Sequence, residues 1–239
     1  MNLNVNVSLK KFTVAQVSIS SFILLIGLAS YLFTHFTGHG SLLGVIRLLD
    51  VGDEQSIPTY FSVLNLLLAS ILLLVIYVYE KSNQIEGALF WLLLSLVFFY
   101  LSVDEAASIH ENFVEVNTFL VNEGFINQVL DTHQWLPFGI LFLVLFAIVF
   151  IPLFKHIDKG TLRKFFIAGF VFVSGAVGLE YLGAVMLETG FVASRSDLIF
   201  AIRRLCEEGL EMYGIVIFNC VLYQEILKRK ISISFNKIQ

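Results

Sequence analysis

The segment LSVDEAASIHENF, residues 101–113, brings three acidic side chains and a histidine to the end of a strongly apolar run. Carboxylates and imidazoles are the side chains that most often transfer protons or bind divalent metal ions in proteins. If this segment continues the preceding helix, Glu105 points away from a broad arc that holds Asp104, Ser108, His110 and Glu111. The residues of that arc are candidates for a polar site.

A second group of charges occurs in RRLCEEGLEMYG, residues 203–214. The i, i+4 spacing predicts surface ion pairs from Arg203 to Glu207 and from Arg204 to Glu208, each worth only a few tenths of a kcal/mol. Glu211 lies one turn deeper and has no such partner. An acid at that depth is costly in lipid, so we expect Glu211 to face other helices.

A third candidate is Glu180, which lies within the otherwise apolar segment SGAVGLEYLGAVM, residues 174–186. Its neighbours include small residues that would let another helix approach closely, namely Ser174, Gly175, Gly178 and Gly183. His133, beside Trp135, is predicted to lie at a similar depth. We therefore expect side chains from several helices to share one layer.

The elements that carry these residues are membrane-spanning helices. The chain has 239 residues, of which 57% are hydrophobic, and a mean hydropathy of +0.84, which is typical of a polytopic membrane protein. An all-α bundle of six transmembrane helices is predicted, forming a single transmembrane domain over residues 1–239. The expected spans are about 14–36, 59–80, 87–105, 135–154, 164–187 and 206–227.

The distribution of basic residues predicts the orientation of the bundle, because Lys and Arg near span ends are retained in the cytoplasm. With six spans, only Arg47, Arg195, Arg203 and Arg204 fall on one side. The other side holds Lys10, Lys11, Lys81, Lys155, Lys159, Arg163, Lys164, Lys228, Arg229, Lys230 and Lys237. Both termini are therefore expected in the cytoplasm, and in a bacterium the protein would lie in the inner membrane with its acidic face in the periplasm.

These features favour the lipid bilayer as partner and argue against nucleic acid. The basic residues are scattered over loops, where topology already explains them, and no Gly-rich phosphate loop is present. A second copy of the chain or another membrane protein could also be a partner.

A pocket with histidine and carboxylates could hold Zn²⁺, Fe²⁺ or Mn²⁺, with ligands from separate helices because no compact metal motif occurs. The predicted ligands are Asp104, His110, Glu180, Glu207 and Glu211. Glu111 and Glu208 are the candidate catalytic bases. The remaining pocket residues are Glu105, Ser108, His133, Arg203 and Arg204. This pattern predicts a metal-dependent membrane enzyme that hydrolyses or oxidises a lipid-like substrate.

Two other interpretations remain open. The charges near Asp104 could simply cap a hydrophobic helix and pair with Arg203 or Arg204. Alternatively, the chain could be a transporter or an accessory or sensor subunit of a membrane complex that uses Glu180 and Glu211 as ion or structural ligands. Transport predicts polar residues along the inner halves of the helices, where Asn219 is the only one expected, and this favours a pocket open on one side.

Three segments together resemble a group of bacterial multi-span membrane proteins without an assigned activity. They are IPTYFS at 57–62, LSVDEAASIHE at 101–111 and EEGLEMYG at 207–214. The resemblance implies that these segments act together, and it implies no particular reaction. Membrane ceramidase-like hydrolases hold zinc with paired His-x-x-x-His residues, which this sequence lacks.

Overall fold

The computed structural model describes residues 7–128 and 130–231, and these are helical with no strand among them. The longer helices are α1 (Leu9–Thr37), α3 (Ile57–Ser82), α4 (Ala88–Ala107), α6 (Leu136–Phe150), α7 (Lys159–Val173) and α9 (Leu198–Lys228). Shorter helices are α2 (Val45–Leu49), α5 (Phe113–Asn122), α8 (Glu180–Glu188) and the 3₁₀ turns Leu42–Gly44, Ile109–Asn112 and Ile151–His156. A π-helical segment, Ser174–Leu179, joins α7 to α8 and is called the π segment below.

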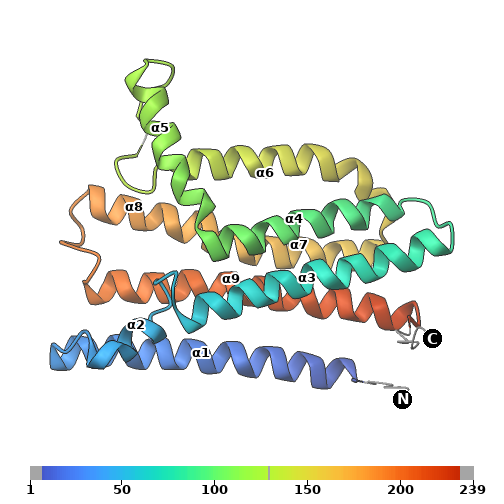
Figure 1. Cartoon of the computed structure of the whole chain (residues 1–239), viewed down its shortest axis with the longest axis horizontal. Coiled ribbons are helices and arrows are strands. Elements are labelled where there is room, and N and C mark those ends of the chain that lie inside the picture. Colours follow the sequence, from blue (N-terminus) through green and yellow to red (C-terminus); the bar gives the residue numbers. More distant parts are fainter. Residues whose placement is uncertain (1–6, 129, 232–239) are drawn as a thin grey trace, which may run out of the picture.

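Five helical runs are long and apolar enough to cross a membrane, which fits a multi-pass membrane protein. They are α1, α3, α4, the continuous run Lys159–Glu188 and α9. The remaining predicted span, about 135–154, corresponds to α6, a shorter apolar helix of 15 residues that is extended by a 3₁₀ turn. With α6 counted, successive helical runs alternate in direction, and α1 begins at the same end of the bundle at which α9 ends (Figure 1).

The predicted spans coincide with these helices, although several helices are longer than expected. The last helix begins at Leu198 rather than near residue 206, so Arg203 and Arg204 lie within it. Local signals explain several of the helix starts. The Ser56 hydroxyl accepts a hydrogen bond from Thr59 N and is followed by Pro58 in the first turn, while the Asp158 carboxylate caps α7 by accepting from Thr161 N.

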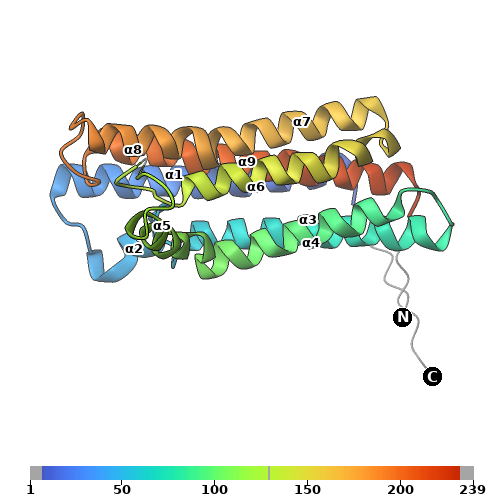
Figure 2. The ribbon, with the colours of Figure 1, turned by 90° about the horizontal axis from the view of Figure 1, so that it is seen from above.

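Helix α9 lies at the centre of the bundle and packs against α1, α3 and α7. Helices α3 and α4 pack along each other and form one layer, whereas α1, α7, α8 and α9 form the other (Figure 2). Large apolar side chains on the outward faces are exposed, including Phe22, Leu25, Ile148 and Phe170. These faces suit contact with lipid.

The main apolar core fills the half of the bundle near the start of α1. It is rich in aromatic rings, with Phe218 stacked on Phe98 at 4.5 Å between centroids and Phe90 edge-on to Trp91 at 5.2 Å. Leu73 and Leu222 are completely buried within it. This dense packing separates the polar residues of the other half from the end of the bundle at which α1 begins.

Two buried acids form ion pairs at the end of the bundle where α1 begins. Glu80 accepts hydrogen bonds from Trp91 Nε1 at 2.8 Å and Arg229 Nη2 at 2.8 Å, and Glu225 pairs with Arg229 and with Lys228 Nζ at 2.6 Å. Thr161 Oγ1 also donates to Glu225 at 2.7 Å. We call these residues, which tie α3, α4, α7 and α9 together, the Glu80–Glu225 network. The expectation that Asn219 is the lone polar residue of the inner halves was therefore wrong.

Candidate functional site

Helix α4 ends at Ala107, before His110 and the third acid of its polar tail, Glu111. Ser108 has φ 51°, a left-handed conformation, and the chain then turns into the 3₁₀ segment Ile109–Asn112. Asp104 stabilises this turn, because its carboxylate accepts from His110 N at 2.8 Å and lies 3.1 Å from His110 Nδ1. The prediction of one continuous helical arc was wrong, and Glu111 is exposed beyond the turn.

A line of contacts connects this turn to α8. The ring of His110 lies edge-on to Trp135, with centroids 4.9 Å apart, and Trp135 Nε1 donates to Glu180 Oε1 at 3.2 Å. His133 Nε2 lies 3.5 Å from the same oxygen. Asp104 of α4, His110 from the turn after α4, His133 and Glu180 are therefore brought together around the indole of Trp135.

The π segment lets α9 approach closely. π-Helical turns are rare and occur frequently at functional sites. A Cβ atom added at Gly175 would lie 2.7 Å from Glu207 O and 2.8 Å from Glu211 Cγ, and one at Gly183 would lie 2.6 Å from Arg203 Cζ. The prediction that small residues allow close approach is confirmed at these two glycines.

Arg203 and Glu207 form a buried ion pair, with each residue only 7% exposed. Arg203 Nη1 also donates to Leu179 O at 2.6 Å, while its Nε is buried without a partner among the described residues. The expected pair was correct, but its surface location was wrong. Arg204 makes no ion pair with Glu208 in the described chain, and its guanidinium lies 5.5 Å from the ring centre of Phe200.

The carboxylates of Glu105, Glu180, Glu207, Glu208 and Glu211 lie within electrostatic range of one another. We call these five residues the acidic cluster. They come from α4, α8 and α9. Glu105, which was expected to point away from the arc of Asp104 but was also named as a pocket residue, belongs to this cluster.

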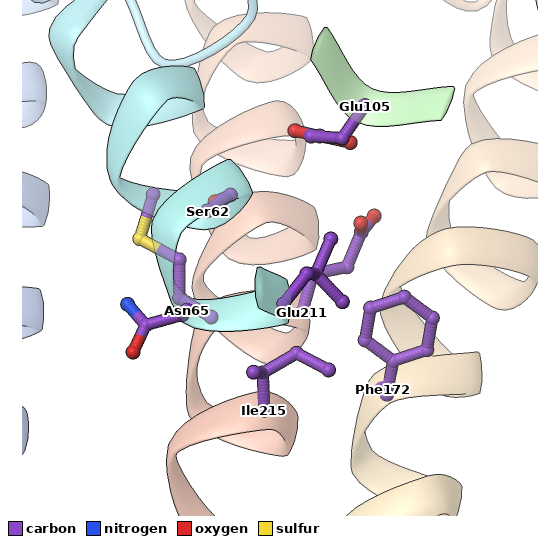
Figure 3. Close-up of a pocket in the computed structure, with 8 residues that line it drawn as sticks. Ser62, Asn65, Glu105, Phe172, Glu211 and Ile215 are labelled. Atoms are coloured by element: carbon purple, nitrogen blue, oxygen red, sulfur yellow. The ribbon is translucent and has the colours of Figure 1, made fainter. Parts of the chain in front are cut away.

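A small cavity of about 20 Å³ lies beside the acidic cluster and has room for a water molecule. Its lining includes Ser62, Asn65, Glu105, Phe172, Glu211 and Ile215. Figure 3 shows the Glu211 carboxylate pointing toward the end of the cavity at which Glu105 lies. Both acids are half-buried inside the bundle, and both border this internal space rather than lipid.

The two histidines near Trp135 have pKa values that are shifted in opposite directions. Burial alone would lower the pKa of His110, but the hydrogen bond and charge of Asp104, with smaller contributions from Glu105 and Glu180, raise it above the ordinary value. Burial, together with the charges of Arg195, Arg203 and Arg204, lowers the pKa of His133 to about 4. At neutral pH His133 is therefore neutral, and His110 is the more readily protonated of the two.

Replacing Asp104 by Asn is expected to lower the pKa of His110 below its ordinary value of 6.5, because burial then acts without the opposing carboxylate. In the parent, the stability contributed by this raised pKa is complete below pH 6.5 and is lost as the pH rises through the folded-state value. Histidine NMR titration of the parent and Asp104→Asn measures the shift. His133 serves as the internal reference, and an unchanged His110 titration would contradict the Asp104 contact.

Glu111 lies outside the acidic cluster and near Glu54. Partial burial and then the charge of Glu111 raise the pKa of Glu54 to about 7. Nothing in this arrangement brings Glu111 to the cavity, so its predicted role as a catalytic base finds no support. Ser108 forms the turn after α4 rather than a lining of the cavity.

The metal site remains a prediction without support. Over residues 7–128 and 130–231, no three His, Cys, Asp or Glu side chains converge in a way that could hold a metal ion. Sequence reasoning also missed Ser62 and Phe172 as cavity residues and Trp135 as a donor to Glu180. A hydroxyl in IPTYFS could have indicated Ser62, whereas no pattern identifies the other two.

Comparison with known proteins gives one match. A family model described as "Domain of unknown function (DUF8692)" matches residues 19–225, which include every helix from α3 to α8, most of α1 and most of α9. No curated protein and no solved structure matches the chain.

Proposed function

The chain belongs to the DUF8692 family, and we propose that it is a membrane protein that binds protons reversibly at the acidic cluster, as a non-catalytic transporter or sensor subunit. One observation carries the proposal. Glu105, Glu208 and Glu211 lie within electrostatic range of one another and form no ion pair with any described residue. Among the residues that the structure describes, Glu207 alone of the cluster forms an ion pair with an arginine.

Electrostatics explains why such a group binds protons. Like charges in a low-dielectric interior repel strongly, so neighbouring carboxylates do not all ionise and instead share protons. An unpaired acid within a membrane helix is also costly and is usually functional. Glu211 lies thirteen residues after the start of α9 and seventeen before its end, hence ~20 Å and ~26 Å along the axis. It is therefore deep within the bundle.

Access to the cluster is proposed from the extracytoplasmic side. Basic residues gather at the end of the bundle where α1 begins. They include Lys10 in the first turn of α1, Lys81 at the end of α3, Lys159 at the start of α7 and Lys228 at the end of α9. The positive-inside rule assigns that end, with both termini, to the cytoplasm. The aromatic core then closes the cytoplasmic half. We place the protein in a bacterial inner membrane with six spans, counting α6 as one.

Infrared spectroscopy of the reconstituted protein tests proton binding, because protonated and ionised carboxyl groups absorb at different frequencies. We expect the parent to keep a protonated carboxyl band at neutral pH that disappears as the pH is raised. Glu208→Gln and Glu211→Gln should each reduce this band. Glu123→Gln, at an exposed position outside the spanning helices, is the matched control and should leave it unchanged.

Two outcomes would contradict the proposal. In one, the parent has no protonated carboxyl band at neutral pH, or the band is insensitive to both substitutions. In the other, protein purified without chelator holds stoichiometric Zn, Fe or Mn that is lost in Glu180→Gln and Glu211→Gln. That second result would restore the interpretation as a metal-dependent enzyme acting on a lipid-like substrate.

A further inference from the structure

A second, larger hollow lies beside the acidic cluster, between α6 and the helices opposite it. It has a volume of about 570 Å³, and its lining includes Leu136, Pro137 and Ile140 on one side and Val177, Gly178 and Tyr181 on the other. This volume is within the range of small-molecule binding sites. We call these six residues the α6 groove.

The α6 groove is apolar and lies at the edge of the bundle. Helix α6 runs along that edge (Figure 1), and its outward side chains Leu141, Leu145 and Ile148 are about half exposed or more. The other wall is the π segment and the start of α8. A Cβ atom at Gly178 would meet nothing within 4 Å, so the groove is open there. In a bilayer such a groove is accessible to a hydrocarbon chain.

The groove ends next to polar groups. Trp135 directly precedes Leu136, and Glu180 directly precedes Tyr181, so the 3.2 Å hydrogen bond between Trp135 and Glu180 joins the residues next to the two walls of the groove. The Glu180 side chain is 18% exposed, and only its Oε1 accepts from Trp135. His133 adds a buried Nδ1 without a partner among the described residues.

The acid at this polar end has one oxygen available to a ligand. Glu180 Oε1 accepts from Trp135 Nε1, whereas no described residue donates to Glu180 Oε2. Arg203, whose charge acts on Glu180, is already engaged by Glu207. A ligand group that donates hydrogen bonds and carries positive charge therefore complements this end better than an anionic group does.

From these observations we propose that the α6 groove binds a membrane lipid with a primary ammonium headgroup. One acyl chain lies between α6 and the π segment, and the ammonium group donates hydrogen bonds to Glu180. Tyr181 and Trp135 would lie where the lipid headgroup joins the acyl chain, a position where amphipathic aromatic side chains are favoured. This inference goes beyond proton binding, and the infrared experiment does not decide it.

Photo-crosslinking of the full-length protein in phosphatidylcholine vesicles tests the site. The probes are phosphatidylethanolamine and phosphatidylglycerol, each carrying a photoreactive acyl chain, and labelled peptides are identified by mass spectrometry. We expect phosphatidylethanolamine to label residues 136–140 and 177–181 more than any outward helix face, and several-fold more than phosphatidylglycerol does. Glu180→Gln should remove the difference between the two headgroups.

Two glycines give a matched test of the groove. Gly178→Phe places a ring in the groove without a backbone clash and should abolish most of the labelling there. Gly169→Phe, on α7, also has open space at Cβ, lies outside the groove and should leave the labelling unchanged. Ile140→Trp, on the opposite wall, should reproduce the effect of Gly178→Phe.

The proposal fails if labelling is spread evenly over the outward faces of α1 and α6, or if Gly178→Phe and Ile140→Trp both leave groove labelling intact. Equal labelling by the two headgroups in the parent would overturn the assignment of an ammonium lipid. Neither result bears on the protonated carboxyl band, so failure here is distinct from failure of the proposed function.

Discussion

Arg203→Met is expected to lower the free energy of unfolding by about 3–5 kcal/mol, the range seen when one member of a buried ion pair is removed. The substitution leaves Glu207 buried without its partner and Leu179 O without its donor. It also removes a positive charge close to an acidic cluster that already repels itself. These effects act in the same direction, so the loss should be among the largest for any single side chain.

Detergent-induced unfolding in mixed micelles, followed by circular dichroism, measures the change. Arg195→Met is the control, because Arg195 is exposed and substitutions at such positions usually change stability by less than about 0.5 kcal/mol. The double variant Arg203→Met with Glu207→Met should recover part of the loss, since both buried charges are then absent. A loss no greater than that of Arg195→Met would show that the pair is not buried in the membrane-bound protein.

Gly214→Ala is expected to destabilise the contact between α7 and α9 by about 1–3 kcal/mol, the usual cost of overpacking. The added Cβ would lie 2.7 Å from Phe172 N and 2.8 Å from Phe172 Cα. These are backbone atoms, so no side-chain rotation relieves the contact and the helices must move apart. Gly175→Ala should behave similarly and should also displace Glu211, changing the protonated carboxyl band.

Gly169→Ala is the matched control for both glycines. It lies on α7, and its Cβ would meet nothing within 4 Å. Alanine favours the helical conformation more than glycine does, so this variant should be unchanged or slightly more stable in the same unfolding assay. If all three alanine variants have equal stability, then α7 and α9 do not approach as closely as the structure indicates.

The sequence was sufficient to predict the helices that cross the bundle. Apolar runs of about 20 residues have few alternatives in a membrane, and Pro58 and Asp158 additionally indicate where α3 and α7 begin. The orientation of Glu211 toward other helices was also anticipated, because unpaired acids avoid lipid.

Other features depend on tertiary contacts that no local pattern encodes. Ser108 adopts a left-handed conformation that serine signals only weakly, and this one residue redirects His110 and Glu111. Glu105 points away from Asp104, as expected, but α4 packs on α3 and the face of α4 that carries Glu105 therefore borders the cavity. The π segment likewise shifts the helical period in a way that the spacing of apolar residues does not show.

The Glu80–Glu225 network also could not be predicted from local patterns, because Arg229 and Glu80 are 149 positions apart in the sequence. In the sequence each of these charges looks like an ordinary helix-end residue, and only the packing of α9 beside α3 brings them together.

The Glu80–Glu225 network gives the bundle one tight end. Four helices are clamped there by charged hydrogen bonds, whereas α6 at the edge has few packing partners and the opposite end is shaped by glycines and a π turn. If the helices move apart, the motion should therefore be hinged at the Glu80–Glu225 network. The displacement should be smallest at that network and larger in the opposite half of the bundle, where Trp135 lies.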